Sequence, residues 1–110
     1  MLADTVSIAA TSAGVTGTIV VGKGARLKRL TCAYVDADGQ PQIIELTWAG
    51  CPTPLRFVPP IAAYPIATSG AAIAVAASIP LDVTVEKADT VTVKVTSNAD
   101  VTTQVGLVWD

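Results

Sequence analysis

The chain of 110 residues contains no histidine, and this absence removes several kinds of chemistry at once. Catalysis by Ser-His-Asp or Cys-His groups needs an imidazole, as do zinc sites with histidine ligands and most proton transfers near neutral pH. Cys32 and Cys51 are the two cysteines, and a pair of thiolates does not complete a zinc site. We therefore expect no catalytic residue, metal, cofactor or small-molecule substrate, and we expect that the chain is not an enzyme.

Charged residues are also scarce, at 15% of the chain with a formal net charge of −2, against roughly 25% in an average soluble domain. A protein that binds nucleic acid needs a basic excess to neutralise phosphates, so we expect no nucleic-acid partner. Hydrophobic residues make up 51% of the chain. A domain of this size cannot hide so many apolar groups in one core, which predicts a second buried surface, most often against copies of itself.

Residues 57–81 carry no charge over 25 positions, a length that could span a bilayer. Four prolines interrupt this stretch, and repeated prolines break a helix, so we expect no membrane span. Residues 1–4 lack the basic and apolar regions of a signal peptide, so we expect synthesis in the cytoplasm without export by cleavage.

Residues 79–110 show the clearest pattern, in which apolar residues alternate with polar ones. The alternating apolar positions are Leu81, Val83, Val85, Val91, Val93, Val95, Val105, Leu107 and Trp109. A period of two, rich in valine and threonine, indicates strands with one buried face and one wet face. The breaks at 86–89 and 97–100 suit tight turns. The pattern predicts an antiparallel meander in this third of the chain.

Earlier strands are predicted over residues 5–10, 16–21, 27–35, 43–49 and 55–58. Leu27 is out of phase with the alternating residues that follow it, which predicts a bulge near Lys28 and Arg29. Residues 71–77 are open to two interpretations, because alanine favours a helix while the alternation of Ile73 and Val75 favours a strand. We favour the strand.

Asp38-Gly39 is the strongest turn signal in the first half and predicts a hairpin. That hairpin would place Cys32 opposite Glu45 and Cys51 opposite Arg26, which separates the two thiols by roughly 20 Å. A disulfide needs Cα atoms within about 7 Å, so we predict two free thiols. A disulfide stays possible in this interpretation only if the chain folds back at Pro52.

Five of the seven prolines lie between positions 52 and 65, which predicts a long, apolar, ordered connection rather than a central strand. About eight short strands with turn signals, and no amphipathic helix, predict a single domain over residues 1–110. The predicted fold class is all-β, an antiparallel β-sandwich. Eight strands with a long connection in the middle of the chain fit a jelly roll.

Two groups of residues are candidates for an interface with a partner. Lys23 and the basic residues after it form a cluster of one sign, which is either a solvated rim or a site that docks onto an acidic protein surface. The proline-rich connection that includes residues 52–65 is too apolar to be a loop without packing contacts. The candidate interface residues are Phe57, Pro59, Pro60, Ile61, Tyr64, Ile66, Arg26, Lys28 and Arg29. Trp48 and Trp109 are in phase with aliphatic neighbours and are predicted in the core.

The run at 17–30, Gly-Thr-Ile-Val-Val-Gly-Lys-Gly-Ala-Arg-Leu-Lys-Arg-Leu, the Asp-Gly hairpin, and Ile-Pro-Leu-Asp-Val-Thr-Val from residue 79 resemble small all-β virion proteins. These are the jelly-roll or β-sandwich decoration (cement) and minor capsid proteins of tailed phages and related viruses. The resemblance implies a structural subunit located in the virion. It also implies a homo-oligomer, with a trimer favoured, that clamps a capsid lattice protein.

Two other functions remain open at this point. One is a β-sandwich binding module for a glycan or a protein, which would need an exposed Trp48 or Trp109. The other is a surface or filament subunit outside viruses. Exchange or donation of the strand within residues 1–10 would instead favour assembly.

Overall fold

The computed structural model describes residues 1–36, 42–51, 53–59, 73–97 and 100–110, and all of its regular structure in these ranges is β-strand. The strands are β1 (Leu2–Ala10), β2 (Val15–Val20), β3 (Ala25–Asp36), β4 (Gln42–Thr47), β5 (Leu55–Phe57), β6 (Ile73–Val85), β7 (Thr90–Ser97) and β8 (Val101–Trp109). The predicted all-β class and the predicted number of strands are confirmed.

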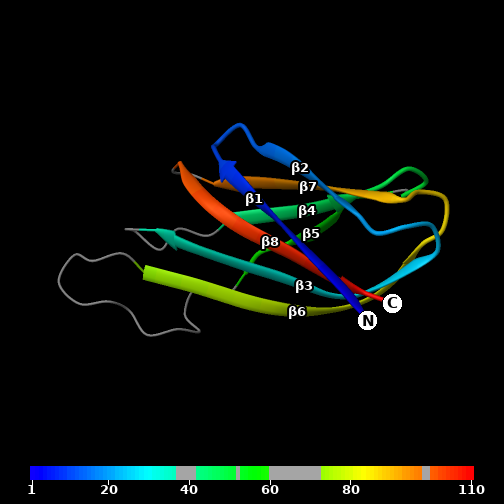
Figure 1. The fold of residues 1–110 in the computed structure, drawn as a ribbon. Helices are drawn as coiled ribbons and strands as arrows, with labels where there is room; N and C mark the ends of the chain where they lie inside the picture. Colours follow the sequence, from blue (N-terminus) through cyan, green and yellow to red (C-terminus); the bar gives the residue numbers. More distant parts are fainter. Residues whose placement is uncertain (37–41, 52, 60–72, 98–99) are drawn as a thin grey trace.

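The strands form two antiparallel sheets of four strands each (Figure 1). Sheet A has the order β1-β8-β3-β6, and sheet B has the order β2-β7-β4-β5. β1 pairs with β8, β2 with β7, β3 with β6, and β4 with β5, all antiparallel. This is the pairing of one long two-stranded ribbon rolled over on itself, which is the jelly-roll form of a β-sandwich. The predicted sandwich and its jelly-roll arrangement are therefore present.

The predicted meander at the C-terminal end is wrong. β6 and β8 lie on either side of β3 in sheet A, while β7 lies in sheet B. The turn after β6 and the connection after β7 therefore carry the chain from one sheet to the other. Alternation of apolar residues defines which face of a strand is buried, but it does not name the strand beside it.

β6 joins two segments that the sequence pattern left separate, and Pro80 lies inside it. β6 is an edge strand, where a residue without an N–H group is tolerated. The register of β3 shifts between Leu27 and Arg29, and Arg29 is paired with Pro80. The predicted bulge is confirmed, as is the choice of strand for the described part of residues 71–77.

The predicted hairpin turn at Asp38-Gly39 lies outside the described residues, but the pairing expected from it is wrong. β3 and β4 belong to different sheets, so Cys32 is paired with Ala77 and Val105 rather than with Glu45. Both cysteines are free, as predicted. The Cys51 thiol donates a hydrogen bond to the carbonyl oxygen of Thr53 at 3.1 Å.

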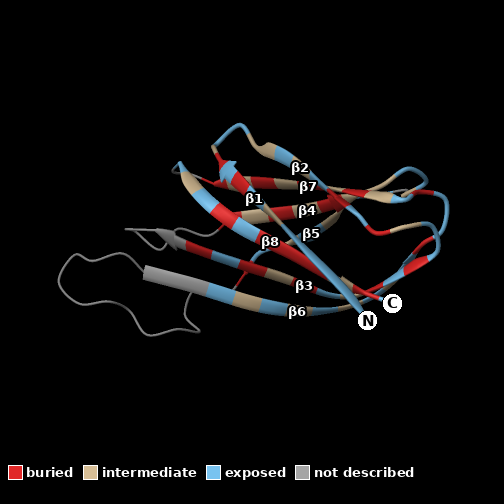
Figure 2. Cartoon of the chain, in the orientation of Figure 1, coloured by how far each residue is buried: buried red, intermediate tan, exposed pale blue. Residues whose placement is uncertain are grey.

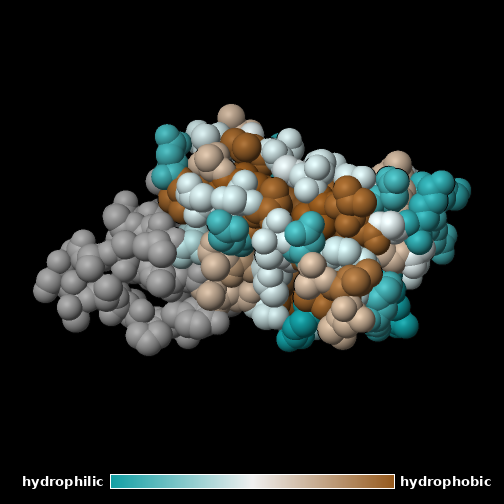
Figure 3. All heavy atoms as spheres, viewed as in Figure 1, coloured by the Kyte–Doolittle hydropathy of each residue, from teal (hydrophilic) through white to brown (hydrophobic). Residues whose placement is uncertain are grey.

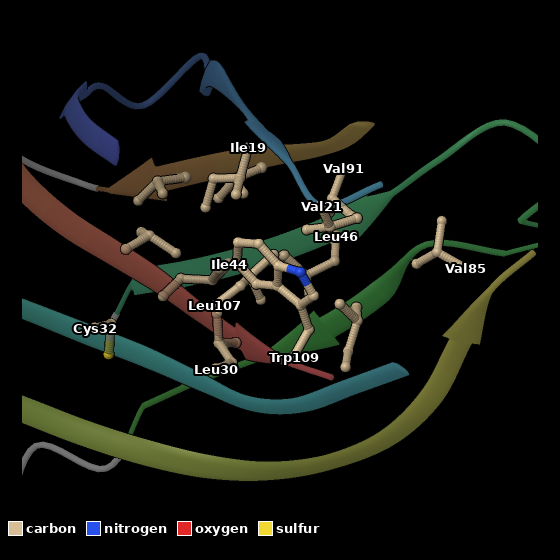
Figure 4. Packing of buried hydrophobic residues seen from close by; sticks show 14 of the residues in the cluster. Ile19, Val21, Leu30, Cys32, Ile44, Leu46, Val85, Val91, Leu107 and Trp109 are labelled. Carbon is tan, nitrogen blue, oxygen red and sulfur yellow. The ribbon is translucent and has the colours of Figure 1, made fainter. Parts of the chain in front are cut away.

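The core lies between the two sheets, and buried residues alternate with exposed ones along the strands (Figure 2). Leu30 and Leu107 from sheet A point toward Ile44 and Leu46 from sheet B (Figure 4). All four side chains are 0% exposed. Trp109 is buried, which confirms its predicted place in the core, whereas Trp48 is half-buried and packs against the core.

The two thiols are expected to differ in reactivity. Burial raises the pKa of the Cys32 thiol above its ordinary range. In the folded protein a water-soluble thiol reagent should modify Cys51, and Cys32 should react only after unfolding. Because the unfolded chain releases the Cys32 proton first, stability should fall as the pH rises from the ordinary thiol pKa toward the raised one. Mass spectrometry of labelled peptides checks the order, and equal labelling of both cysteines in the native protein would contradict it.

Candidate assembly surfaces

Away from the end that carries Arg26, Asp82 and Asp110, the outer face of sheet A consists of small and mostly uncharged side chains. They are the outward-facing residues that alternate with the core positions: Ala3, Thr5, Ser7 and Ala9 on β1, Thr102, Gln104, Gly106 and Val108 on β8, Arg29, Thr31 and Ala33 on β3, and Ala76, Ser78 and Pro80 on β6. Arg29 is the one charged residue in this set. Its Nε donates a hydrogen bond to Ser78 Oγ at 2.9 Å, so the side chain lies along the sheet toward β6.

Gly106 lies in the middle of this face, between Thr5 on β1 and Thr31 on β3. A Cβ atom at position 106 would collide with Thr31 Oγ1 and would come within 3.2 Å of Thr5 Cγ2. The glycine therefore leaves room for the side chains of Thr5 and Thr31 above β8.

One end of sheet A is charged, and its charges are paired within the chain. Arg26 Nη2 lies 2.7 Å from Asp82 Oδ1, and Arg26 Nε donates to the same oxygen at 2.8 Å. This hydrogen bond and the positive charge of Arg26 lower the pKa of the Asp82 carboxyl. Lys28 Nζ lies 3.9 Å from Asp110 Oδ2. The predicted basic cluster is thus partly neutralised by acids of the same chain, and its docking onto an acidic surface stays a prediction.

The described part of the predicted apolar interface packs into the sandwich. Phe57 is half-buried, is paired with Ile44, and packs against the core, while Pro59 is buried. The other predicted residues of this group, namely Pro60, Ile61, Tyr64 and Ile66, lie outside the described residues. Contact of this segment with a partner therefore stays a prediction.

Large exposed apolar side chains occur mainly outside the candidate interface residues. Met1, Leu2 and Val20 are 88%, 59% and 66% exposed, and they belong to the β1 and β2 side of the sandwich. In Figure 3, hydrophobic patches lie over the paths that β1 and β2 follow in Figure 1. Period-two alternation at the start of β1 was visible in the sequence. It could not show that β1 is an edge strand whose first residues no opposing strand covers.

A hollow of about 300 Å³ opens between the end of β4 and the turn after β6. Its lining residues are Trp48, Ala49, Gly50, Cys51, Val83, Thr84, Glu86 and Lys87. An indole ring, a hydroxyl group, a carboxylate and an ammonium group thus surround a space that would hold one small polar molecule. Within the described ranges, no three residues among cysteine, aspartate and glutamate gather closely enough to hold a metal ion.

In the part of the chain that the structure describes, no helix has the length and hydrophobicity that crossing a membrane requires. The chain matches no protein-family model, and none of the curated proteins matches it in sequence.

Proposed function

We propose that the chain is a structural assembly protein, a jelly-roll subunit that binds neighbouring protein surfaces and stabilises a lattice. The observation that carries this proposal is the outer face of sheet A away from its charged end, on which Arg29 is the only charged residue among those that the structure describes. A soluble face that needs no partner usually carries charges, which oppose unwanted association. This face carries almost none, so it is suited to close contact with another protein.

The size of the face favours a lattice over an isolated pair. Four strands at about 4.8 Å spacing and seven residues at about 3.4 Å give roughly 450 Å² on each copy. A stable interface buries about 800 Å² on each partner. One such face therefore supports a weak contact, and firm attachment needs several contacts at once, as in a lattice where effective concentration strengthens each one.

Within structural proteins, we propose a virion decoration or minor capsid subunit. Jelly rolls recur in viral capsid proteins, although the same fold also serves lectins and cupins. The resemblance of residues 17–30 and 79–85 to small virion proteins supports the capsid role. The proposed partners are copies of the chain and a capsid lattice protein, without a role for nucleic acid or catalysis.

A charge placed on the outer face of sheet A should abolish higher assembly. We expect the wild-type chain to form species larger than a dimer at millimolar concentration. Ala33→Glu should fold normally and lose these species, because a carboxylate buried at the contact would be unpaired. Thr47→Glu, which places the same charge on the outer face of sheet B, is the matched control. Light scattering on a sizing column gives the masses. A wild-type chain that stays at 11.2 kDa would contradict the proposal.

A second candidate, a small-molecule binding module, is favoured by the position of Trp48. Its half-buried indole lines the hollow together with Thr84 and Glu86. An aromatic face beside a hydroxyl and a carboxylate suits a sugar ring. A monomeric chain whose tryptophan fluorescence changes on titration with monosaccharides, and does not change in Trp48→Leu, would support this module over assembly.

A further inference from the structure

The two side edges of the sandwich differ in how they are protected. On one side, β5 has three residues and carries the exposed Arg56, and β6 carries Pro80 and the exposed Asp82. Pro80 is paired with Arg29 but has no N–H group, so this pair is not hydrogen-bonded and the backbone of Pro80 faces the open edge. Short strands, charges and proline on an edge are the usual means of preventing strand pairing between molecules.

The opposite edge, formed by β1 and β2, has almost none of these features. β1 has nine residues and β2 has six, neither strand contains proline, lysine or arginine, and Asp4 is their only charged residue. Leu2 and Val20 expose more than half of their side chains here. β1 has β8 on one side and no strand on the other within the described sheet. Its second row of backbone groups is therefore a template for a further strand.

One hydrogen bond shows which backbone groups of β1 face outward from the sheet. The Thr5 N–H donates to Asp4 Oδ1 at 2.8 Å, which places Thr5 among the residues that face the open edge. In an antiparallel pair, residues alternate between those bonded to the neighbour and those facing away. Ala3, Ser7 and Ala9 therefore face the open edge with Thr5.

We infer that β1 pairs with β1 of a second copy in antiparallel fashion about a two-fold axis, which joins two copies of sheet A into one continuous sheet. This inference rests on the proposed structural role and names the first contact of the assembly. A strand that pairs with itself about a two-fold axis gives a closed, self-complementary contact. The partner is thus a second copy of this chain.

The register of the pair follows from length and charge. In an antiparallel pair, the numbers of any two opposite residues add to the same sum. The core-facing residues of β1 have even numbers, so those of both copies lie on one face of the joined sheet only if this sum is even. A sum of twelve places Val6 opposite Val6 and Leu2 opposite Ala10, and it is the register that pairs all nine residues of β1. It also places Asp4 opposite Ile8, whereas a sum of eight would set Asp4 against Asp4 and repel. The four outward-facing residues of each copy then form about eight backbone hydrogen bonds, a number typical of a specific interface.

The test compares the same substitution on the two edges. Ala9→Pro removes an N–H from the open edge of β1. Ala76→Pro makes the same change on the outer edge of β6, the edge that already carries Pro80 and Asp82. In sedimentation measurements over a concentration series well below the millimolar range, the wild-type chain should approach twice its 11.2 kDa mass. Ala9→Pro should raise the dissociation constant of the dimer about tenfold, because two hydrogen bonds are lost per dimer. Ala76→Pro should leave the constant unchanged.

A second variant keeps the inference open to test if Ala9→Pro fails to fold. Asp4→Ala frees the Thr5 N–H and removes the edge charge, so it should tighten the dimer several-fold. Association that responds to neither Ala9→Pro nor Asp4→Ala, or a closed trimer, would overturn β1 pairing and leave the structural role standing. If the dimer responds to these variants as expected but Ala33→Glu does not change the larger species, the result would support β1 pairing and contradict the lattice role.

Discussion

Replacing Leu107 with alanine is expected to lower the free energy of unfolding by about 2–5 kcal/mol. Leu107 is fully buried on β8, which is flanked by β1 and β3 in sheet A. It points toward Leu30, Ile44 and Leu46 in the middle of the core (Figure 4). Alanine would leave a cavity that two paired sheets cannot collapse to fill, because the backbone on both sides is held by hydrogen bonds.

A loss of this size is a large share of the roughly 5–15 kcal/mol that stabilises a typical domain. Val108→Ala is the matched control, because Val108 is the next residue on β8, is half-buried and faces outward. The control should cost less than about 1 kcal/mol. Urea unfolding followed by tryptophan fluorescence measures both variants, at one low protein concentration because association adds to apparent stability. Equal costs for the two variants would mean that β8 does not face the core as described.

Replacing Thr103 with valine is expected to cost about 1–3 kcal/mol, because it leaves a buried acceptor without its donor. Thr103 Oγ1 on β8 donates a hydrogen bond to Gln42 Oε1 on β4 at 2.8 Å, and both residues are 0% exposed. β8 belongs to sheet A and β4 to sheet B, so this bond joins the two layers through the core. Gln42 Nε2 has no hydrogen-bond partner in the described part of the chain, so the amide already carries a cost.

The double variant Gln42→Met with Thr103→Val removes both polar groups and nearly conserves their volume. It should recover most of the stability that Thr103→Val loses, since an apolar pair of similar shape leaves nothing unsatisfied. Urea unfolding of the wild type, both single variants and the double variant gives the coupling energy between the two positions. A coupling energy near zero would show that Gln42 is satisfied by another group, and the proposed link between the sheets would be wrong.

The candidate surfaces were only partly accessible from the sequence. The basic residues Arg26 and Lys28 were recognised as a cluster, but their acidic partners lie far away in the chain, at Asp82 and Asp110. The weakly charged part of the outer face of sheet A could not be recognised as a unit in the sequence, because its residues come from four strands. A face becomes visible only when strand order and register are known.

The sequence by itself determined the positions of most strands, the bulge near Arg29 and the burial of Trp109. These follow from local alternation and from the position of Leu27 out of phase with it. Alternation gives a strand the same buried face whichever strand lies beside it. The free thiols were also predicted, although from a pairing of β3 with β4 that does not form. The tertiary structure alone decided that Cys32 lies beside Ala77 and Val105.

It also decided that the last strands separate into two sheets, and that β1 and β6 form the edges of sheet A. The physical reason is that alternation reports which side of a strand meets the core, while pairing depends on contacts between residues far apart in the chain. Many partners satisfy the same alternation, and only the packing of the whole core selects one of them.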